Sequence, residues 1–405
     1  MAVCRFARYC HVSCLDYDRF GLGVRSARVE PRRPAPTHRK LGPMVSTLDI
    51  RTAAKYGVFA FLAIVFAGNA ARAEEAAAPL PSLSANTTKT SVSGISSGAY
   101  MAGQFQIAHS KTVVGAAIIA GGPYGCAESA FSDMMLGPGA AFLNLSKAIN
   151  GCMLNALALW GVPDVPALAE KTRKLAASGR IDPLENLLDD RVYLFSGSND
   201  RTVVPAIVAA AYEFYKRLGI PQSQLTYVSN LPAGHAFVTA DLGLACESTG
   251  KPYVVDCDYD QAGDVLKHVY GDLVPRVATP GGTFIEFDQR PFLAGKSNHG
   301  MEDRGVAYVP KSCATTTACR VHIAFHGCAQ NRENTGEQFI RDSGYANWAD
   351  SNAFVVLFPQ AASSPVNPQG CWDWWGYTGH DYLTRDAPQI DAVYKMLEHL
   401  GQPRP

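Results

Sequence analysis

The chain has 405 residues, in which 36 Lys and Arg balance 36 Asp and Glu, with 47% hydrophobic and only 18% charged residues. This composition allows one large or two ordinary domains, and it excludes long disordered tails, coiled coils and collagen-like repeats. Residues 1–73 contain 12 basic and 4 acidic residues, which leaves 24 basic and 32 acidic residues in the rest of the chain. Because a mildly acidic surface repels phosphates, we expect neither nucleic acid nor an anionic membrane as a partner.

The region before residue 74 has the layout of an export signal. Arg51 and Lys55 precede the apolar run Tyr56–Gly68, and Ala71-Arg72-Ala73 follows it with small residues at the two positions that signal peptidase reads. The run has about half the length that a bilayer-spanning helix needs. We therefore expect a signal peptide cleaved after Ala73, although a buried core helix is the alternative.

Met44 lies just before this segment and is expected to be the true start. Residues 44–73 then form the signal peptide, and residues 1–43 are a non-native or disordered extension. The protein would be exported to the periplasm or the medium, with no integral membrane association after cleavage.

Eight cysteines follow the expected cleavage site, an even number that an oxidising compartment would pair. No two of them have the CxxC spacing typical of zinc sites, so no metal is expected from them. Other pairings remain open, but the spacing suggests two short loops and two remaining pairs: Cys246–Cys257, Cys313–Cys319, Cys126–Cys152 and Cys328–Cys371.

Residues 74–405 are expected to form a single catalytic domain, since no second linker or repeat follows the small-residue spacer Glu74–Ala85. Short β-branched runs alternate with segments that carry apolar residues at helical spacing. The alternation predicts an α/β fold with a mostly parallel sheet covered on both faces, in which chemistry collects at the carboxyl ends of the strands. The expected strands are Thr90–Val92, Val113–Ala120, Arg191–Phe195, Leu225–Val228, Arg320–Phe325 and Phe354–Phe358, and the expected helices are Tyr100–His109, Val204–Leu218 and Ile390–Leu400.

The pentapeptide GISSG, which has Ser96 at its centre, matches the G-x-S-x-G pattern of a nucleophile elbow. It follows a strand-like run and opens a helix, and this context favours the elbow over an ordinary Ser/Gly turn. A serine hydroxyl is a weak nucleophile until an imidazole takes its proton, and that imidazole needs an acid to fix its tautomer.

Asp200 and His235 are the candidates for these two roles. Asp200 lies in GSNDRTVV between an expected strand and helix, and His235 lies in AGHAF after the strand Leu225–Val228. The order Ser, Asp, His is that of α/β-hydrolases. The alternatives are a helix N-cap for Asp200 and a merely hydrogen-bonded loop histidine for His235.

Only about twenty residues separate the expected cleavage site from Ser96, too few for the strand and loop that normally supply an oxyanion donor before the nucleophile. A strand ending in the HG element appears downstream instead, at Val321–Cys328. The simplest explanation is a circular permutation that cuts the chain just before the elbow strand. His326 is then an oxyanion-loop residue, and we expect it to contact the substrate. A metal pair with His322 is disfavoured because the run is strand-like and lacks the Glu of H-E-x-x-H.

The cluster CWDWWGY, residues 371–377, places several aromatic rings near the chemistry. Tryptophan is commonly a core residue, but these rings can also wall an apolar cleft. A disulfide from Cys371 to Cys328 would tether the cluster to the oxyanion loop, which favours substrate contact for Trp374 and Trp375.

GISSGAYMA, GSNDRTVV, AGHAF, FHGCAQ and CWDWWGY, in this order, resemble the poly(3-hydroxybutyrate) depolymerases whose catalytic domain is circularly permuted. The resemblance covers about Thr90–Leu400. It implies an α/β-hydrolase with Ser96 as nucleophile, Asp200 and His235 as its partners, and the backbone N–H groups of Ser97 and Cys328 as the oxyanion hole. It also implies a tryptophan near the scissile ester, within Trp374-Trp375.

The expected function is therefore that of an exported serine esterase that hydrolyses poly(3-hydroxybutyrate) or its oligomers through an acyl-enzyme, with no cofactor. The partner would be a polyester or oligoester; the oligomeric state stays open. Many secreted members of the family append a separate polymer-binding domain, whereas others have a single domain. None is evident after the last expected helix, which puts activity on crystalline polymer in question. One rival is a feruloyl or acetyl esterase of plant polysaccharide with the same triad, and another is a noncatalytic binding protein with this fold.

Overall fold

The apolar runs of the sequence form the strands of a central sheet in the computed structural model, which describes residues 77–128, 138–154, 163–315 and 318–404. The sheet strands are β1 (Asn86–Ile95), β2 (Val113–Ile119), β3 (Arg191–Phe195), β4 (Leu225–Val228), β8 (Thr283–Asp288), β9 (Arg304–Val309), β10 (Arg320–Phe325) and β11 (Phe354–Phe358). Their order across the sheet is β4-β3-β2-β1-β10-β11-β9-β8. The expected signal peptide and the extension before it lie outside the described residues.

The six strands from β4 to β11 in this order are parallel, whereas β9 pairs antiparallel with both β11 and β8. The mostly parallel sheet is thus confirmed, and β8 and β9 are strands that the sequence patterns missed. A smaller three-stranded sheet lies apart from it, in the order β5-β7-β6. Its strands are β5 (Phe237–Thr239), β6 (Leu244–Ala245) and β7 (Val254–Asp256).

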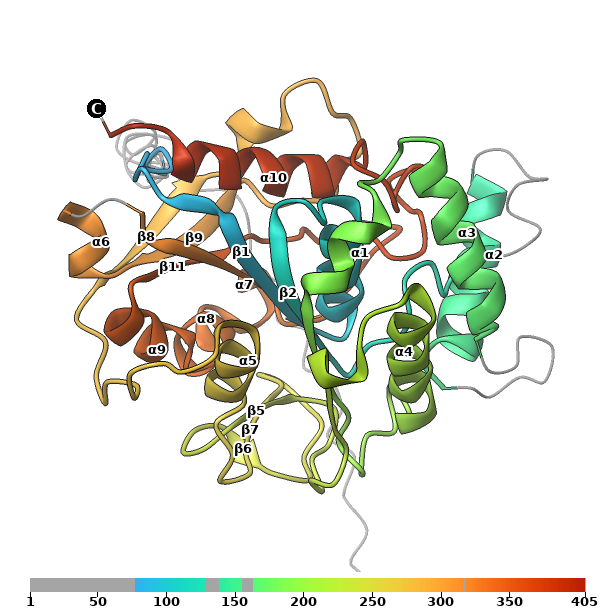
Figure 1. The fold of residues 1–405 in the computed structure, drawn as a ribbon, viewed down its shortest axis with the longest axis horizontal. Helices are drawn as coiled ribbons and strands as arrows, with labels where there is room; N and C mark the ends of the chain where they lie inside the picture. Colours follow the sequence, from blue (N-terminus) through green and yellow to red (C-terminus); the bar gives the residue numbers. More distant parts are fainter. Residues whose placement is uncertain (1–76, 129–137, 155–162, 316–317, 405) are drawn as a thin grey trace, which may run out of the picture. The chain divides into compact units, whose positions relative to one another are not determined.

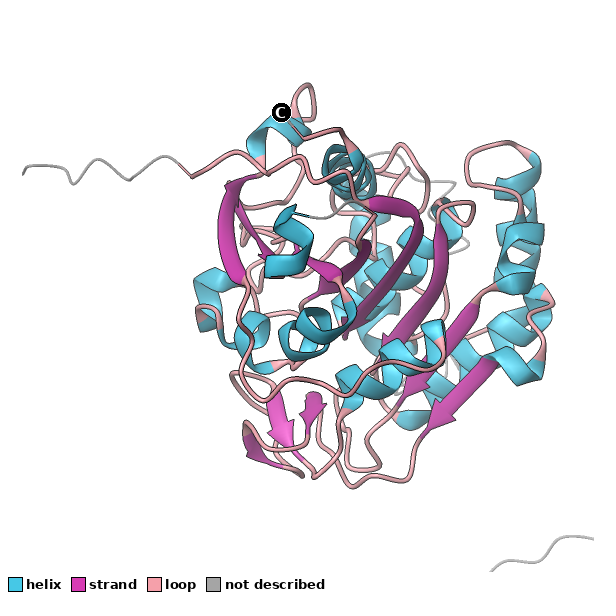
Figure 2. Cartoon of the chain, turned by 60° about the vertical axis from the view of Figure 1, so that its left-hand side comes forward, coloured by secondary structure: helices cyan, strands magenta, loops and turns pink. Residues whose placement is uncertain are grey.

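Helices cover both faces of the sheet, as Figures 1 and 2 show. The α-helices are α1 (Ser97–Ala108), α2 (Pro138–Gly151), α3 (Val165–Ala177), α4 (Pro205–Leu218), α5 (Gln261–Tyr270), α6 (Lys311–Thr315), α7 (Arg332–Thr335), α8 (Gln338–Asp342), α9 (Tyr345–Asn352) and α10 (Pro388–Gly401). Short 3₁₀ helices are η2 (Leu184–Asp189), η3 (Gln222–Gln224) and η4 (Arg290–Leu293). No helix among the described residues is long and apolar enough to span a bilayer.

The alternation of side chains along each strand divides the core into two layers. Val321, Ile323 and Phe325 of β10 pack with residues of α1, α4 and α10 on one face. Ala324 of the same strand packs with residues of α5, α8 and α9 on the other face. Both faces are therefore dry, which explains why the parallel strands read as continuous apolar runs.

The chain order confirms the expected circular permutation. β10 lies directly beside β1 in parallel register, with Gly94 opposite Phe325, although it follows β1 by more than two hundred residues. The end of α10 lies against the segment that leads into β1, because the N–H groups of Leu83 and Ala85 donate to the Leu400 carbonyl at 3.1 and 3.0 Å. The oxyanion strand thus occupies its place next to the nucleophile strand while lying C-terminal to it in sequence.

Candidate active site

Ser96 occupies a strained turn between β1 and α1. Its φ of 57° and ψ of −121° lie in a region that residues other than glycine rarely adopt. A Cβ on Gly94 would overlap the Gly98 carbonyl, and a Cβ on Gly98 would overlap the carbonyls of Phe325 and His326. Both glycines of the G-x-S-x-G pattern are therefore required, because neighbouring backbone lies too close to leave room for a side chain. The strand-turn-helix context expected from the sequence is present.

Asp200 and His235 form a buried pair. Asp200 Oδ2 lies 2.8 Å from His235 Nδ1, and the two residues are 0% and 5% exposed. Asp200 Oδ1 accepts the N–H groups of Thr202 and Val203 at 2.8 and 2.9 Å, so the carboxylate is held rigidly from its other side. An acceptor at Nδ1 keeps the proton on that nitrogen and leaves Nε2 free to act as a base. The N-cap of α4 is Val204, so the capping alternative for Asp200 does not apply to that helix.

The sheet brings these residues to one edge. Ser96 directly follows β1, Asp200 follows β3 and His235 follows β4, and these strands run parallel, so their carboxyl ends share an edge. The structure joins Asp200 to His235 directly. Ser96 lies at the same edge, but within the described part of the chain its hydroxyl makes no hydrogen bond within 3.5 Å, to His235 or to any other residue. Catalytic hydrogen bonds in unliganded enzymes are often long and tighten when substrate binds.

The HG loop after β10 packs against Ser96. A Cβ on Gly327 would lie 3.4 Å from Ser96 Cβ. Ser97 is the first residue of α1, where backbone N–H groups lack intrahelical acceptors. The Cys328 N–H also has no hydrogen-bond acceptor among the residues that the structure describes. Two free donors thus lie on the two segments that flank Ser96, as an oxyanion site requires.

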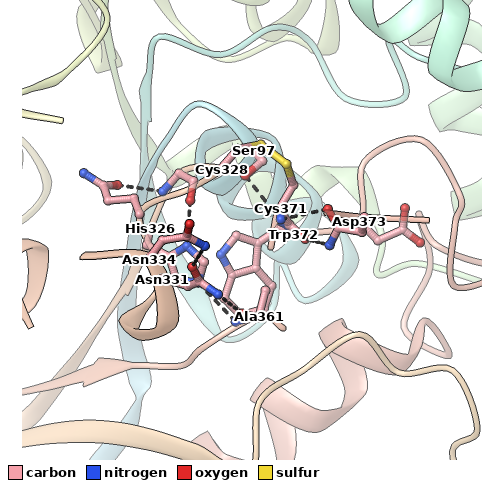
Figure 3. The surroundings of a disulfide bond; sticks show 12 residues. Ser97, His326, Cys328, Asn331, Asn334, Ala361, Cys371, Trp372 and Asp373 are labelled. Atoms are coloured by element: carbon pink, nitrogen blue, oxygen red, sulfur yellow. Dashed lines mark hydrogen bonds between the residues drawn. A yellow bond between two sulfur atoms is a disulfide. The ribbon is translucent and has the colours of Figure 1, made fainter. Parts of the chain in front are cut away.

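All four disulfides predicted from cysteine spacing are confirmed: Cys126–Cys152, Cys246–Cys257, Cys313–Cys319 and Cys328–Cys371. Figure 3 shows the last of them beside Ser97, with Trp372 following Cys371 in the chain. The Trp372 N–H lies 3.4 Å from the Ser97 hydroxyl. The bridge therefore joins the HG loop to the aromatic segment right beside the nucleophile elbow.

His326 is enclosed beneath this loop and is 1% exposed. Its Nε2 accepts the Ala361 N–H at 3.1 Å, so Nδ1 carries the proton and donates to the Gly327 carbonyl at 2.8 Å. Burial lowers the pKa of His326 to about 4. Since both ring nitrogens face backbone groups, neither is available to substrate, and this geometry favours a role in holding the loop over the direct contact expected from the sequence.

Both ring nitrogens of His322 lie within hydrogen-bond distance of serine hydroxyls. Its Nδ1 and Nε2 lie 2.7 and 2.9 Å from the hydroxyls of Ser91 and Ser93, which join β10 to β1 across the buried sheet. No group of three or more His, Cys, Asp or Glu side chains in the described ranges could hold a metal. The pair His322 and His326 is therefore occupied by hydrogen bonds within the protein.

Burial lowers the pKa of His322 to about 3, so this imidazole is neutral in the folded protein but binds a proton below its ordinary pKa of about 6.5 when unfolded. The contribution of buried, neutral His322 to the free energy of unfolding is therefore complete above pH 6.5. It falls by about 1.4 kcal/mol for each pH unit below that value. We expect His322→Gln to be less stable at pH 7.5, with its deficit from the wild type shrinking from pH 6.5 toward pH 4.

Urea unfolding at several pH values measures this difference. Comparing the two proteins cancels other titrating groups, including Asp190 and Glu302, whose pKa values burial raises to about 7 and which act in the opposite direction. A deficit that stays constant with pH would show that burial does not lower the pKa of His322.

Trp374 and Trp375 lie in a small buried cluster beside the nucleophile helix. Trp374 stacks on Tyr100, four residues after Ser96, with ring centroids 4.0 Å apart and planes at 8°. Trp375 meets Trp374 edge-on at 5.9 Å. The two side chains are 5% and 6% exposed, so they combine core packing with a position next to the elbow.

Asp373 organises this aromatic segment and is a residue that the sequence patterns did not single out. Its Oδ1 accepts the Gly376 and Tyr377 N–H groups at 2.6 and 3.0 Å, and its Oδ2 accepts from the N–H and hydroxyl of Thr378 at 2.8 and 2.6 Å. Burial raises the pKa of Asp373 against these hydrogen bonds. The only signal in the sequence was an acidic residue amid aromatic ones, which composition alone does not interpret.

The chain is similar to known depolymerases in sequence and in fold. No protein-family model matches the chain. A poly(3-hydroxybutyrate) depolymerase of Delftia acidovorans is 38% identical over 331 residues, which cover 80% of this chain and 62% of the relative. The chain thus spans somewhat less than two thirds of that relative. A polyhydroxybutyrate depolymerase of Talaromyces funiculosus is 33% identical over 349 residues, which cover 82% of this chain and 93% of the relative.

Two solved structures share the fold. The PHB depolymerase from Penicillium funiculosum matches with a TM-score of 0.70 and 31% identity, over 80% of this chain and 98% of the other. A PHB depolymerase with a serine replaced by alanine, complexed with an R3HB trimer, matches with the same values.

Proposed function

Because the chain belongs to the poly(3-hydroxybutyrate) depolymerase family, we propose that it is a serine esterase that hydrolyses the ester bonds of poly(3-hydroxybutyrate) or its oligomers. The observation that carries the proposal is the buried Asp200–His235 pair at the sheet edge that also holds Ser96. A relative with an R3HB trimer bound supports the oligoester as substrate class.

The reaction proceeds in two halves. Ser96 Oγ attacks the ester carbonyl while His235 Nε2 takes its proton, and Asp200 stabilises the imidazolium that forms. The Ser97 and Cys328 N–H groups bind the negative oxygen of the tetrahedral intermediate. His235 returns the proton to the departing secondary alcohol, which leaves an acyl group on Ser96. Water then attacks this acyl group in the same way, releases the 3-hydroxy acid and restores Ser96.

Trp374 and Trp375 are proposed to form the apolar wall of the substrate cleft. Their support is the stack on Tyr100 and the Cys328–Cys371 bridge, which places them beside the elbow and the HG loop. We assign His326 to positioning that loop, since its ring nitrogens bind backbone groups.

We also propose that residues 74–405 form the catalytic domain and that residues 44–73 direct it to the periplasm or the medium, with residues 1–43 outside the functional protein. Four disulfides fit an oxidising compartment. N-terminal sequencing of the native precursor and of the processed protein tests both boundaries.

The activity is tested by assaying the processed protein on amorphous polymer, crystalline polymer, soluble 3-hydroxybutyrate oligomers and feruloyl esters. We expect release of 3-hydroxybutyrate or its short oligomers from at least the soluble and amorphous substrates, with much slower turnover of feruloyl esters. Faster turnover of feruloyl esters would reassign the substrate class while leaving the triad in place. Identification of the products by mass spectrometry separates these results.

A further inference from the structure

Gln330 has a side-chain amide whose three hydrogen bonds all go to the backbone. Its Oε1 accepts the Gly327 N–H at 2.7 Å, and its Nε2 donates to the carbonyls of Pro252 and Tyr253 at 3.1 Å each. The residue is 2% exposed. Only one orientation of the amide fits, because the opposite orientation would face oxygen with oxygen and N–H with N–H.

The two carbonyls belong to the disulfide-closed loop Cys246–Cys257, which also holds the histidine segment. The His235 N–H donates to Thr249 Oγ1 at 2.8 Å, and the Gly234 N–H donates to the Cys246 carbonyl at 3.0 Å. The Tyr253 carbonyl that Gln330 binds also accepts the Phe237 N–H at 2.9 Å. One side chain thus connects the HG loop to the segment that carries the catalytic base.

We propose that Gln330 is a positioning residue that fixes the oxyanion hole relative to His235. The inference rests on the proposed esterase function. By binding the Gly327 N–H, Gln330 holds the His326–Gly327 peptide. This peptide is joined through the Gly327 Cα to the Gly327–Cys328 peptide, whose N–H is left without an acceptor in the described part of the chain. A donor contributes to catalysis only when it lies 2.7–3.1 Å from the position of the developing oxyanion, so a small rotation of this peptide lowers the rate.

Glutamine is the side chain that this position requires. It offers an acceptor to Gly327 and two donors to Pro252 and Tyr253 at once. An ionised glutamate would accept from Gly327 but would repel both carbonyls, whereas a protonated one could again accept and donate. Methionine would fill a similar volume without forming any of these hydrogen bonds.

Gln330→Met is expected to lower kcat on soluble 3-hydroxybutyrate oligomers by about 10- to 100-fold, somewhat less than the loss of a whole oxyanion donor. KM should stay within about threefold, because the cleft walls are unchanged. A trifluoromethyl ketone analogue, which forms a tetrahedral adduct, should lose affinity in proportion to kcat/KM.

Lys251→Met is the matched control. Lys251 Nζ donates to Asn334 Oδ1 at 2.8 Å and so links the same disulfide-closed loop to α7, just after the HG loop, but on the exposed side and without touching Gly327. We expect its kcat to stay within twofold of the wild type. Thermal unfolding of each variant reports whether the fold is intact.

Gln330→Glu gives an independent readout. Burial raises the pKa of a carboxyl group, so the ratio of its kcat to that of the wild type should rise as the pH is lowered, whereas the ratio for Gln330→Met should stay flat. The proposal is overturned if Gln330→Met keeps wild-type kcat, if analogue affinity does not follow kcat/KM, or if both variants fail to fold. If the wild type itself hydrolyses none of the esters, the proposed function fails first, which distinguishes the two failures.

Discussion

Replacing Ser96 with alanine is expected to lower kcat for ester hydrolysis by about 10⁴- to 10⁶-fold, as loss of the nucleophile does in other serine hydrolases. In the proposed mechanism this hydroxyl is the group that forms the acyl-enzyme. The change removes one oxygen, and Ser96 keeps its backbone hydrogen bond to the Ile119 carbonyl at 2.9 Å, so the fold should persist. Initial rates on soluble oligomers and thermal unfolding measure the two effects.

Ser198→Ala is the matched control, because Ser198 is an exposed serine in the loop before Asp200. It should retain wild-type turnover. An organophosphate should label the wild type and this control at Ser96, as peptide mass spectrometry would show, and should not label Ser96→Ala. Near-native turnover by Ser96→Ala would remove Ser96 from the mechanism, and absence of labelling in an intact wild type would favour a noncatalytic protein.

Asp200→Asn should lower kcat by about 10⁴-fold with little effect on the fold. The new amide oxygen can still accept the Thr202 and Val203 N–H groups, so its NH₂ group is turned toward His235 Nδ1. A donor at that place forces the proton onto Nε2, and the imidazole can then no longer accept the proton of Ser96. A low-field proton resonance from the Nδ1–H should disappear at the same time.

Asp164→Asn controls for the loss of a charge, since Asp164 caps α3 by accepting the Ala167 N–H at 3.1 Å. Its kcat should be unchanged. If Asp200→Asn retained more than a tenth of wild-type kcat, Asp200 would not set the tautomer of His235, and the pair would be structural.

Most of the parallel strands were predictable because they are buried on both faces. β3, β10 and β11 begin and end at the predicted residues, since dry parallel strands leave nearly uninterrupted apolar runs. The bounds of β4 also match the prediction, although this edge strand is mostly half-buried. β8 and β9 were missed, because β8 is largely half-buried and both strands bear charged residues, which weakens the pattern. The α/β fold could thus be predicted, but its antiparallel edge could not.

The candidate site shows the same division. Ser96, Asp200 and His235 were recognisable because each lies in a short motif that follows an expected strand, in the chain order that α/β-hydrolases use. The roles of His326 and Gln330 depend on Ala361 and on the Pro252-Tyr253 carbonyls, which are distant in sequence and have no signature of their own. Such contacts between side chain and distant backbone arise only in the folded chain.

The pairing of β1 with β10 also means that the two halves of the site are synthesised at different times. Ser91 and His322, which meet across these strands, are 231 residues apart. A ribosome that adds about 5 to 20 residues per second needs about 12 to 46 s to make that interval. The proposed nucleophile Ser96 is therefore made well before the proposed oxyanion donor Cys328, so a translation product that ends between these two residues lacks part of the proposed site.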